Sequence, residues 1–138
     1  KMIQLLPNYP SCYVCGDSNN FGLHQKFYYD DHSKTVFTDF KPSSKYTGYK
    51  NIVHGGILLT MLDEVMAWAC ICMTGKPCMT VKMDARFLKK AYSEVNYRIS
   101  ASVTKSKANM IFASSDVKDD SGQIFYEASA VYIAEDDD

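Results

Sequence analysis

The sequence predicts an α+β fold in which an antiparallel sheet of six strands wraps around one long central helix. Three observations support this prediction. Residues 55–73 are rich in Leu, Met and Ala, and no proline or glycine follows the opening Gly55-Gly56 pair, which is typical of a helix of about five turns. Two strand-like segments precede this helix and four follow it. The chain has 138 residues, 46% of them hydrophobic, which suffices for one core but not for two ordinary domains.

The segments before the helix are expected to form a hairpin. Residues 24–29 and 35–40 have strand character, and the polar cluster at residues 30–33 suits a tight turn. Residues 41–50 hold Pro42 and Gly48, so they are expected to form an irregular loop. Residues 1–21 are expected to be an N-terminal arm of the single domain 1–138, and residues 135–138 an acidic, solvated tail.

The chain after the helix has β character almost throughout. The helix is expected to end near Gly75-Lys76-Pro77. Four strands are predicted at residues 78–88, 95–104, 110–117 and 124–133, with turns at 105–109 and 118–123. We expect these strands to form a meander.

The helix is apolar nearly all round, so we expect the rest of the protein to enclose it. Gly56, Thr60, Asp63 and Ala67 follow one another at helical spacing and form a stripe of small or polar residues. This stripe leaves room for a ligand or a close-packed partner beside the Asp63 carboxylate. Glu64 projects about 100 degrees around the helix from Asp63, so the two acids cannot face one site equally, and Glu64 is predicted to be a supporting or interface acid.

Charge and composition exclude several classes of protein. Fifteen basic and sixteen acidic residues give a formal net charge of −1, so nucleic acid is not an expected partner. The first ten residues lack the features of a secretory signal, and a cytoplasmic location is expected. Residues 52–73 carry two acids near their middle, which is costly in a bilayer, so no membrane association is expected.

The five cysteines are expected to be reduced thiols. Cys70, Cys72 and Cys78 are interpreted as small buried hydrophobic residues. Cys12 and Cys15 have the spacing of half a zinc site, but a structural zinc needs four ligands and no second such motif is present. The sequence therefore favours a tight turn and no metal, with a site shared between two copies as the alternative.

Four motifs together resemble the hotdog-fold, PaaI-like acyl-CoA thioesterases, and the resemblance covers nearly the whole chain. HGG alone is a weak signal, but HGG with an acid nine residues on, inside an apolar helix and followed by four strands, is specific. The motifs are Cys12-Tyr-Val-Cys15-Gly16 followed by Asn20-Phe-Gly22-Leu23, then Val53-His54-Gly55-Gly56, then Asp63-Glu64, then Met79-Thr80-Val81.

The resemblance assigns the chemistry to two places on the helix. A helix N-terminus offers unpaired N–H groups and a partial positive charge, and the resemblance implies that the amide of Gly55 or Gly56 polarises the thioester carbonyl. Asp63, contributed across a dimer interface, is implied to activate water or to attack the carbonyl itself. Thr80 is implied to orient the water. His54 is expected to hold the turn through its ring, with catalysis as the alternative.

One contact of the family is missing. Relatives place an Asn or Gln side chain near the carbonyl from the loop before HGG, but this chain has Gly48 there, and Asn51 is a candidate substitute. The resemblance also implies a cleft for acyl-CoA between subunits of a homodimer or a dimer of dimers, with no cofactor. The nucleotide end is expected near the predicted turn, at Lys105, Ser106, Lys107 and Asn109.

Two other functions stay open, and so does the acyl group. A non-catalytic acyl-CoA sensor is possible because Gly48 removes a carbonyl contact. A hotdog hydratase or dehydratase needs a second proton-moving group, but His24 and His32 lie far from the motif in sequence. The acyl group, aryl or fatty, depends on how Trp68 and the methionines 61, 66 and 73 pack.

Overall fold

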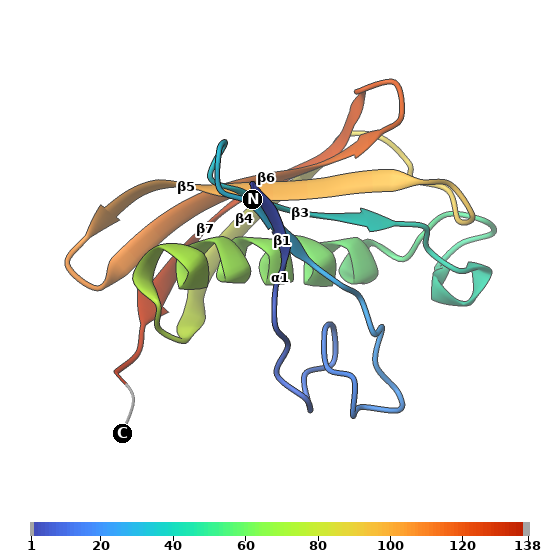
Figure 1. The fold of residues 1–138 in the computed structure, drawn as a ribbon. Coiled ribbons are helices and arrows are strands. Elements are labelled where there is room, and N and C mark those ends of the chain that lie inside the picture. The colour runs from blue at the N-terminus through green and yellow to red at the C-terminus, as the bar shows by residue number, and fades with distance from the viewer. Residues whose placement is uncertain (1, 137–138) are drawn as a thin grey trace.

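The expected architecture is confirmed, with one strand more than predicted. A computed structural model describes residues 2–136, so the end of the expected acidic tail lies outside the described residues. An antiparallel sheet curves around one long helix (Figure 1). The elements are β1 (Ile3–Leu5), β2 (Tyr28–Asp30), β3 (Thr35–Phe40), the 3-10 turn η1 (Ser44–Tyr46), α1 (Gly55–Thr74), β4 (Cys78–Phe87), β5 (Tyr97–Lys107), β6 (Met110–Asp119) and β7 (Ile124–Ala134).

The sheet gains its seventh strand from the N-terminal arm. β1 pairs antiparallel with β2, so part of the predicted arm is ordered at one edge of the sheet. β2 is shorter than predicted: its pairing with β3 begins at Tyr28, and His24, the expected first residue, has a left-handed backbone with φ 53°, which lies outside the β region. At the other hairpin β5 continues to Lys107, and the turn occupies only residues 108–109.

The four strands after α1 do not form the expected meander. The strand order is β1-β2-β3-β5-β6-β7-β4, so among the four strands after α1 only β5, β6 and β7 are sequential neighbours. β4 pairs with β7 and lies at the edge of the sheet opposite β1. The link at residues 75–77 is short and keeps β4 beside the helix, while β3 pairs with β5 at the other side of the meander. A sequence pattern identifies strands but not their neighbours, which is why the expectation was wrong.

α1 begins and ends at identifiable caps. The side chain of His54 caps its N-terminus, and Gly75 ends it with φ 71°. The residues that pack into the core recur every three or four positions, which places them on one side of the helix. The buried residues of α1 are Leu58, Met61, Leu62, Val65, Met66, Trp68, Ala69 and Cys70.

The opposite side of α1 is open, so the helix is not enclosed all round as expected. Thr60, Asp63 and Ala67 are only half-buried, and Gly56 and Met73 are exposed. By length and composition alone α1 is apolar enough to cross a membrane, but in this fold its buried residues form the core over the sheet. The open side faces β4, where Met79, Val81, Phe87 and Leu88 are each more than half exposed.

Candidate active site

The turn before α1 is held by its own histidine. His54 donates its N–H to the carbonyl of Tyr46 at 2.8 Å, and Val53 donates to Ala91 at 2.8 Å. The ring nitrogen Nδ1 of His54 accepts the N–H of Gly56 at 3.0 Å. This contact is the positioning role expected for His54, because it fixes the ring against the first turn of the helix.

The same contacts decide which helix amide is free. The N–H of Gly56 is bonded to the His54 ring, and the N–H of Ile57 to the His54 carbonyl at 2.9 Å. Within residues 2–136 no acceptor is recorded for the N–H of Gly55. A side chain at position 55 would displace the ring of Phe87, because a Cβ there would approach that ring to 2.7 Å. Of the two predicted glycines, Gly55 is therefore the one with an N–H available for a ligand.

Asp63 lies two turns further along α1 and is held through one carboxylate oxygen. Its Oδ1 accepts the hydroxyl of Thr80 at 2.7 Å and the hydroxyl of Tyr132 at 2.7 Å. The Tyr132 hydroxyl also lies 2.9 Å from the Asp63 carbonyl. No partner is recorded for Oδ2 in the described part of the chain. One oxygen of Asp63 is thus fixed by two donors, and the other is free to act on a ligand or a water.

A β-bulge brings Thr80 to this position. The pairing of β4 with β7 shifts between Thr80 and Lys82, which leaves Val81 unpaired. Without this bulge, Thr80 and Met83 would project to opposite faces of the sheet, because side chains alternate along a strand. With it, both pair with residues of the inward-facing row of β7, and Thr80 lies opposite Tyr132.

Tyr132 belongs to the site although the sequence did not single it out. Its ring is fully buried. Burial, and then the negative charge of Asp63, raise the pKa of Tyr132 far above its usual range, so the phenol keeps its proton and serves as a donor. The inward spacing of Tyr126, Ala128, Ala130 and Tyr132 along β7 was the only available signal, and it indicates burial rather than a role at Asp63.

The two parts of the predicted site do not meet within one chain. Gly55 and Asp63 are eight residues apart on one helix, a separation of about 12 Å at 1.5 Å per residue. A single thioester carbonyl cannot contact both groups at once over that distance. The geometry of one chain therefore supplies two half-sites.

The loop before the HGG turn contains Gly48 and Asn51, and Gly48 lies beside His54. A Cβ at Gly48 would lie 3.5 Å from His54 Cδ2, which is ordinary contact. Position 48 therefore lies beside the capping ring and has room for a side chain. Asn51 is exposed, and its carbonyl accepts the N–H of Ser93 at 2.8 Å, so nothing in this contact directs its amide toward Gly55.

The predicted nucleotide-binding residues lie elsewhere. Lys105 and Lys107 are in β5, and Asn109 is in the following turn. Figure 1 places this hairpin beyond the C-terminal end of α1, away from the HGG turn. The ammonium of Lys105 lies 4.6 Å from the centre of the Phe112 ring, while no ion pair or ring contact is recorded for Lys107 in the described chain.

A second cluster lies on the other side of α1. Glu64 points to the N-terminal arm, where the Cys12 thiol approaches its carboxylate oxygens at 3.7 and 3.6 Å. The indole N–H of Trp68 donates to Glu64 Oε2 at 3.0 Å. Cys15 completes the cluster, and burial raises the pKa of its thiol to about 12. The prediction that Asp63 and Glu64 face different surroundings is consistent with these contacts.

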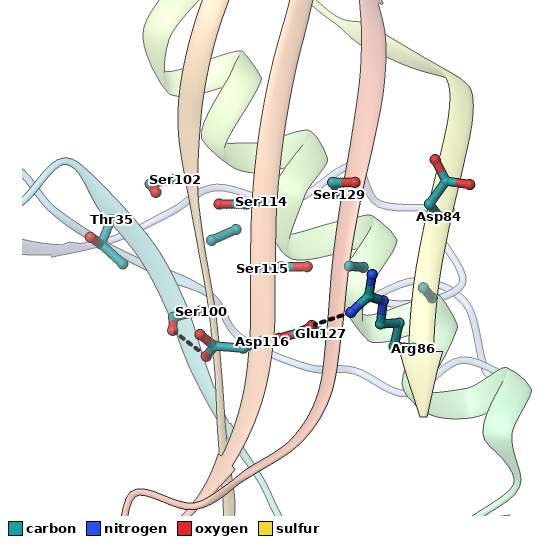
Figure 2. A pocket seen from close by; sticks show the side chains of 13 residues that line it. Thr35, Asp84, Arg86, Ser100, Ser102, Ser114, Ser115, Asp116, Glu127 and Ser129 are labelled. Atoms are coloured by element: carbon teal, nitrogen blue, oxygen red, sulfur yellow. Dashed lines mark hydrogen bonds and ion pairs between the residues drawn. The ribbon is translucent and has the colours of Figure 1, made fainter. Parts of the chain in front are cut away.

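A large hollow of the surface lies away from all of these residues. It has a volume of about 950 Å³ and is formed by strands β3 to β7 on the sheet face opposite α1. Figure 2 shows its polar side chains, with Ser100 bonded to Asp116 and Arg86 to Glu127. None of the predicted site residues lines it. The hollow follows from the curvature of the sheet and its short serine side chains.

The sequence of this chain matches a family model. The model describes the Thioesterase superfamily and covers residues 50–126, which include the HGG turn, α1, β4, β5, β6 and the start of β7. The chain is also 35% identical over 79 residues to the uncharacterized protein C26H8.11c of Schizosaccharomyces pombe, over 56% of this chain and 45% of that protein. The match thus spans less than half of the relative.

Solved structures share the hotdog architecture at low sequence identity. A thioesterase superfamily protein superposes with a TM-score of 0.81 at 18% identity, covering 90% of this chain and 60% of that one. An acyl-CoA hydrolase from Staphylococcus aureus, in complex with butyryl coenzyme A, coenzyme A and coenzyme A disulfide, gives 0.71 at 18% identity over 77% and 66% of the two chains. A hypothetical thioesterase from Streptococcus pneumoniae with coenzyme A gives 0.69 at 18% identity over 72% and 80%.

Proposed function

Because this chain belongs to the thioesterase superfamily, we propose that it hydrolyses an acyl-CoA thioester to a free acid and coenzyme A. The Asp63 carboxylate carries the proposal, since Thr80 and Tyr132 hold one oxygen and leave the other free. Similar structures that contain coenzyme A or butyryl coenzyme A support this substrate class. A PaaI-like subfamily assignment fits the HGG turn and its acid nine residues on.

In the proposed reaction, Asp63 acts as a general base. Its free Oδ2 takes a proton from a water molecule, and the resulting hydroxide attacks the thioester carbon. The N–H of Gly55, at the positive end of α1, stabilises the oxyanion that forms. The carbon–sulfur bond then breaks, and the proton held by Asp63 passes to the departing thiolate. The Thr80 hydroxyl donates to Asp63 and can still accept a proton of the attacking water.

The separation of the half-sites requires two copies of the chain. Gly55 of one copy and Asp63 of the other meet if two α1 helices run antiparallel, because their two-fold axis then passes midway between these positions. Each dimer would contain two complete sites. This arrangement is a proposal that rests on the spacing of about 12 Å within one chain.

The free edge at β4 is the proposed dimer contact. Within residues 2–136, β4 pairs only with β7, so its outer backbone groups face no other strand, and Met79, Val81 and Phe87 of β4 are exposed. Such an edge favours pairing with another strand. If Met83 lies near the two-fold axis, Lys82 of one copy comes opposite Asp84 of the other. The positive and negative side chains then form favourable cross-strand pairs.

The nucleotide end of the substrate is proposed to lie at the β5–β6 hairpin. Lys107 is the ammonium best placed for a phosphate, because Lys105 lies over the Phe112 ring. Ser106 and Asn109 add hydrogen-bonding groups. Because the hairpin and Asp63 are carried by one chain, the acyl end and the nucleotide end can bind along the open side of α1.

The test is thiol release from a panel of aryl-CoA and fatty acyl-CoA esters, with the wild type and Asp63→Asn assayed in parallel. We expect turnover of at least one ester by the wild type, and its loss in the variant while the variant stays folded and dimeric. Saturable binding without turnover of any ester would reject hydrolysis.

A labelling experiment separates the two roles considered for Asp63. A nucleophilic carboxylate would form an anhydride with the acyl group, and attack of water on its Asp63 carbonyl carbon would incorporate solvent oxygen into Asp63. A general base sends solvent oxygen directly to the acid product and leaves Asp63 unlabelled. Label in the peptide that contains residue 63, measured by mass spectrometry after a single turnover in ¹⁸O-water, would therefore identify a nucleophilic Asp63. We expect no label in the peptide.

One observation favours a second function, an acyl-CoA-binding sensor. Gly48 lacks the side chain that would assist the carbonyl, and the N–H of Gly56 is occupied by His54. The remaining donor for an oxyanion is Gly55. In a sensor the wild type and Asp63→Asn would bind acyl-CoA equally and neither would release thiol.

A further inference from the structure

The cluster at the N-terminal arm has the chemistry of a metal site. The Sγ atoms of Cys12 and Cys15 and a carboxylate oxygen of Glu64 all lie within 4.8 Å of one another. Two of these ligand atoms come from a tight turn in the arm and one from the middle of α1, 52 residues from Cys12. Two sulfurs and one carboxylate oxygen form a donor set that suits zinc.

The spacing of these atoms fits tetrahedral coordination. With zinc–sulfur bonds of about 2.3 Å and zinc–oxygen bonds of about 2.0 Å, a tetrahedral site separates two sulfurs by about 3.8 Å and a sulfur and an oxygen by about 3.5 Å. The distances from Cys12 Sγ to the Glu64 oxygens are 3.7 and 3.6 Å. Metal binding would therefore require only small side-chain adjustments.

The backbone of the arm is built to hold the two sulfurs together. The N–H of Cys12 donates to the Tyr9 carbonyl at 2.9 Å, and the N–H of Gly16 donates to the Cys12 carbonyl at 3.0 Å. A Cβ at position 16 would lie 2.4 Å from the Pro10 carbonyl oxygen, so only glycine fits. The turn Cys12 to Gly16 thus has both the ligand spacing and the tightness of half a zinc site.

The carboxylate of Glu64 is oriented by a neighbour and lacks a basic partner. The Trp68 indole N–H donates to Oε2 at 3.0 Å, and outer hydrogen bonds of this kind orient ligands in metal sites. Among residues 2–136 no lysine, arginine or histidine forms an ion pair with Glu64. A half-buried carboxylate beside two thiols and no cation is poorly neutralised.

We propose that Cys12, Cys15 and Glu64 bind one Zn²⁺ per chain, with solvent as the fourth ligand. On binding, both thiols lose their protons to solvent, and the two thiolates and the carboxylate coordinate the ion. Zinc then fastens the N-terminal arm to α1 on the side that carries Glu64, about 100 degrees around the helix from Asp63. This site supplies the third ligand that was missing from the Cys12 and Cys15 motif, and it needs no second copy of the chain.

The test uses the reduced, metal-free chain titrated with Zn²⁺ against a chromophoric chelator. We expect one Zn²⁺ per chain for the wild type, and a rise in Tm that a chelator reverses. Cys12→Ser, Cys15→Ser and Glu64→Gln should each weaken zinc binding at least about 100-fold. Trp68→Phe, which removes the indole donor together with part of the buried ring, should weaken it about tenfold. Cys72→Ser is the matched control and should bind like the wild type.

A spectroscopic measurement covers variants that fold poorly. Co²⁺ added to the wild type should give a thiolate-to-cobalt charge-transfer band that Zn²⁺ removes, and Glu64→Gln should change its visible spectrum. Two results overturn the proposal. One is a reduced wild type that takes up no stoichiometric zinc; the other is zinc binding that is equal in the wild type and in Cys12→Ser and Cys15→Ser.

Discussion

The two adjacent acids on α1, Asp63 and Glu64, contact different groups. Asp63 faces β4 and β7, where hydroxyls of Thr80 and Tyr132 hold one oxygen and the other is free. Glu64 faces the arm, where two thiols and an indole surround its carboxylate. The helical rotation of about 100 degrees between neighbours accounts for the difference. The comparison shows that the neighbours of an acid, rather than its position in the sequence, determine the chemistry open to it.

The strongest test of this contrast is Asp63→Ala. Loss of the general base should lower kcat about 100- to 10,000-fold, measured as thiol release from the best acyl-CoA ester. Zinc stoichiometry should stay at one per chain, because Glu64 and the arm are untouched. Asp120→Ala, which removes an exposed acid from the β6–β7 turn, is the control. A change in zinc content with Asp63→Ala would show that the two sides are coupled.

Val81→Glu tests whether the Asp63 side needs a second copy. Val81 is 58% exposed on the free edge, so the change should spare the fold of one chain. It places two negative charges in a two-fold interface and should weaken dimerisation about 100-fold or more. As the variant is diluted, its sedimentation coefficient and its activity should fall together. Val95→Glu changes another exposed valine and is the control that should keep both dimerisation and activity. An active Val81→Glu monomer would contradict the two-chain site.

Thr80→Val tests the hydroxyl contact to Asp63. Loss of one hydrogen bond to the carboxylate should lower kcat about tenfold, equivalent to about 1.4 kcal/mol. KM should change little, because Thr80 is proposed to act on water and Asp63 rather than on the bound ester. Thr80→Ser keeps the hydroxyl and should recover most of the activity. Equal kcat in the valine and serine variants would remove Thr80 from the mechanism.

Tyr132→Phe tests the second donor through pH. The pKa of Tyr132 is raised in the folded state, so its contribution to stability is fully present below the unfolded value of about 10 and is lost as pH rises above it. The wild type should therefore lose stability in alkali more steeply than the variant. Near neutral pH the variant should be less stable by about 1–2 kcal/mol. Urea unfolding at a series of pH values measures both effects.

Gly48→Asn should have the smallest effect and the opposite sign. Position 48 lies beside the His54 ring, where a Cβ would make ordinary contact, and an amide there is proposed to assist the thioester carbonyl. We expect a rise in kcat of about threefold, within the range for a partly formed oxyanion contact. Gly48→Ala adds no donor and should leave kcat unchanged. A fall in kcat with both variants would indicate that position 48 must stay open.

Most of the fold was predictable because its pattern is local. The bounds of α1 and of β6 and β7 followed from helical spacing, strand character and turn residues, within a few positions. The pairing of β4 with β7 could not be predicted, because the partner of a strand depends on the whole sheet. β1 was missed since three residues in an arm carry little pattern, and β2 begins later than predicted, at Tyr28, after the left-handed backbone at His24.

Residues of the candidate site that belong to a sequence motif could be predicted. Residues that only contacts across the sheet bring to the site could not. The resemblance pointed to His54, the two glycines and Asp63. It could not distinguish Gly55 from Gly56, because that depends on which amide the His54 ring accepts. Tyr132 and the contact of Glu64 with Cys12 join residues 69 and 52 positions apart, and a single sequence gives no measure of such proximity.

The distance of about 12 Å between Gly55 and Asp63 along α1 has a genetic consequence. If the proposed two-chain site is correct, a chain that lacks Asp63 and a chain whose helix entrance is blocked would each be inactive alone, yet a mixed dimer would hold one intact site. Random reassortment of equal amounts should restore about a quarter of the wild-type sites. Two inactive alleles would then complement each other in one cell, and an inactive allele would leave the output of a normal one unchanged, because each mixed dimer keeps one intact site.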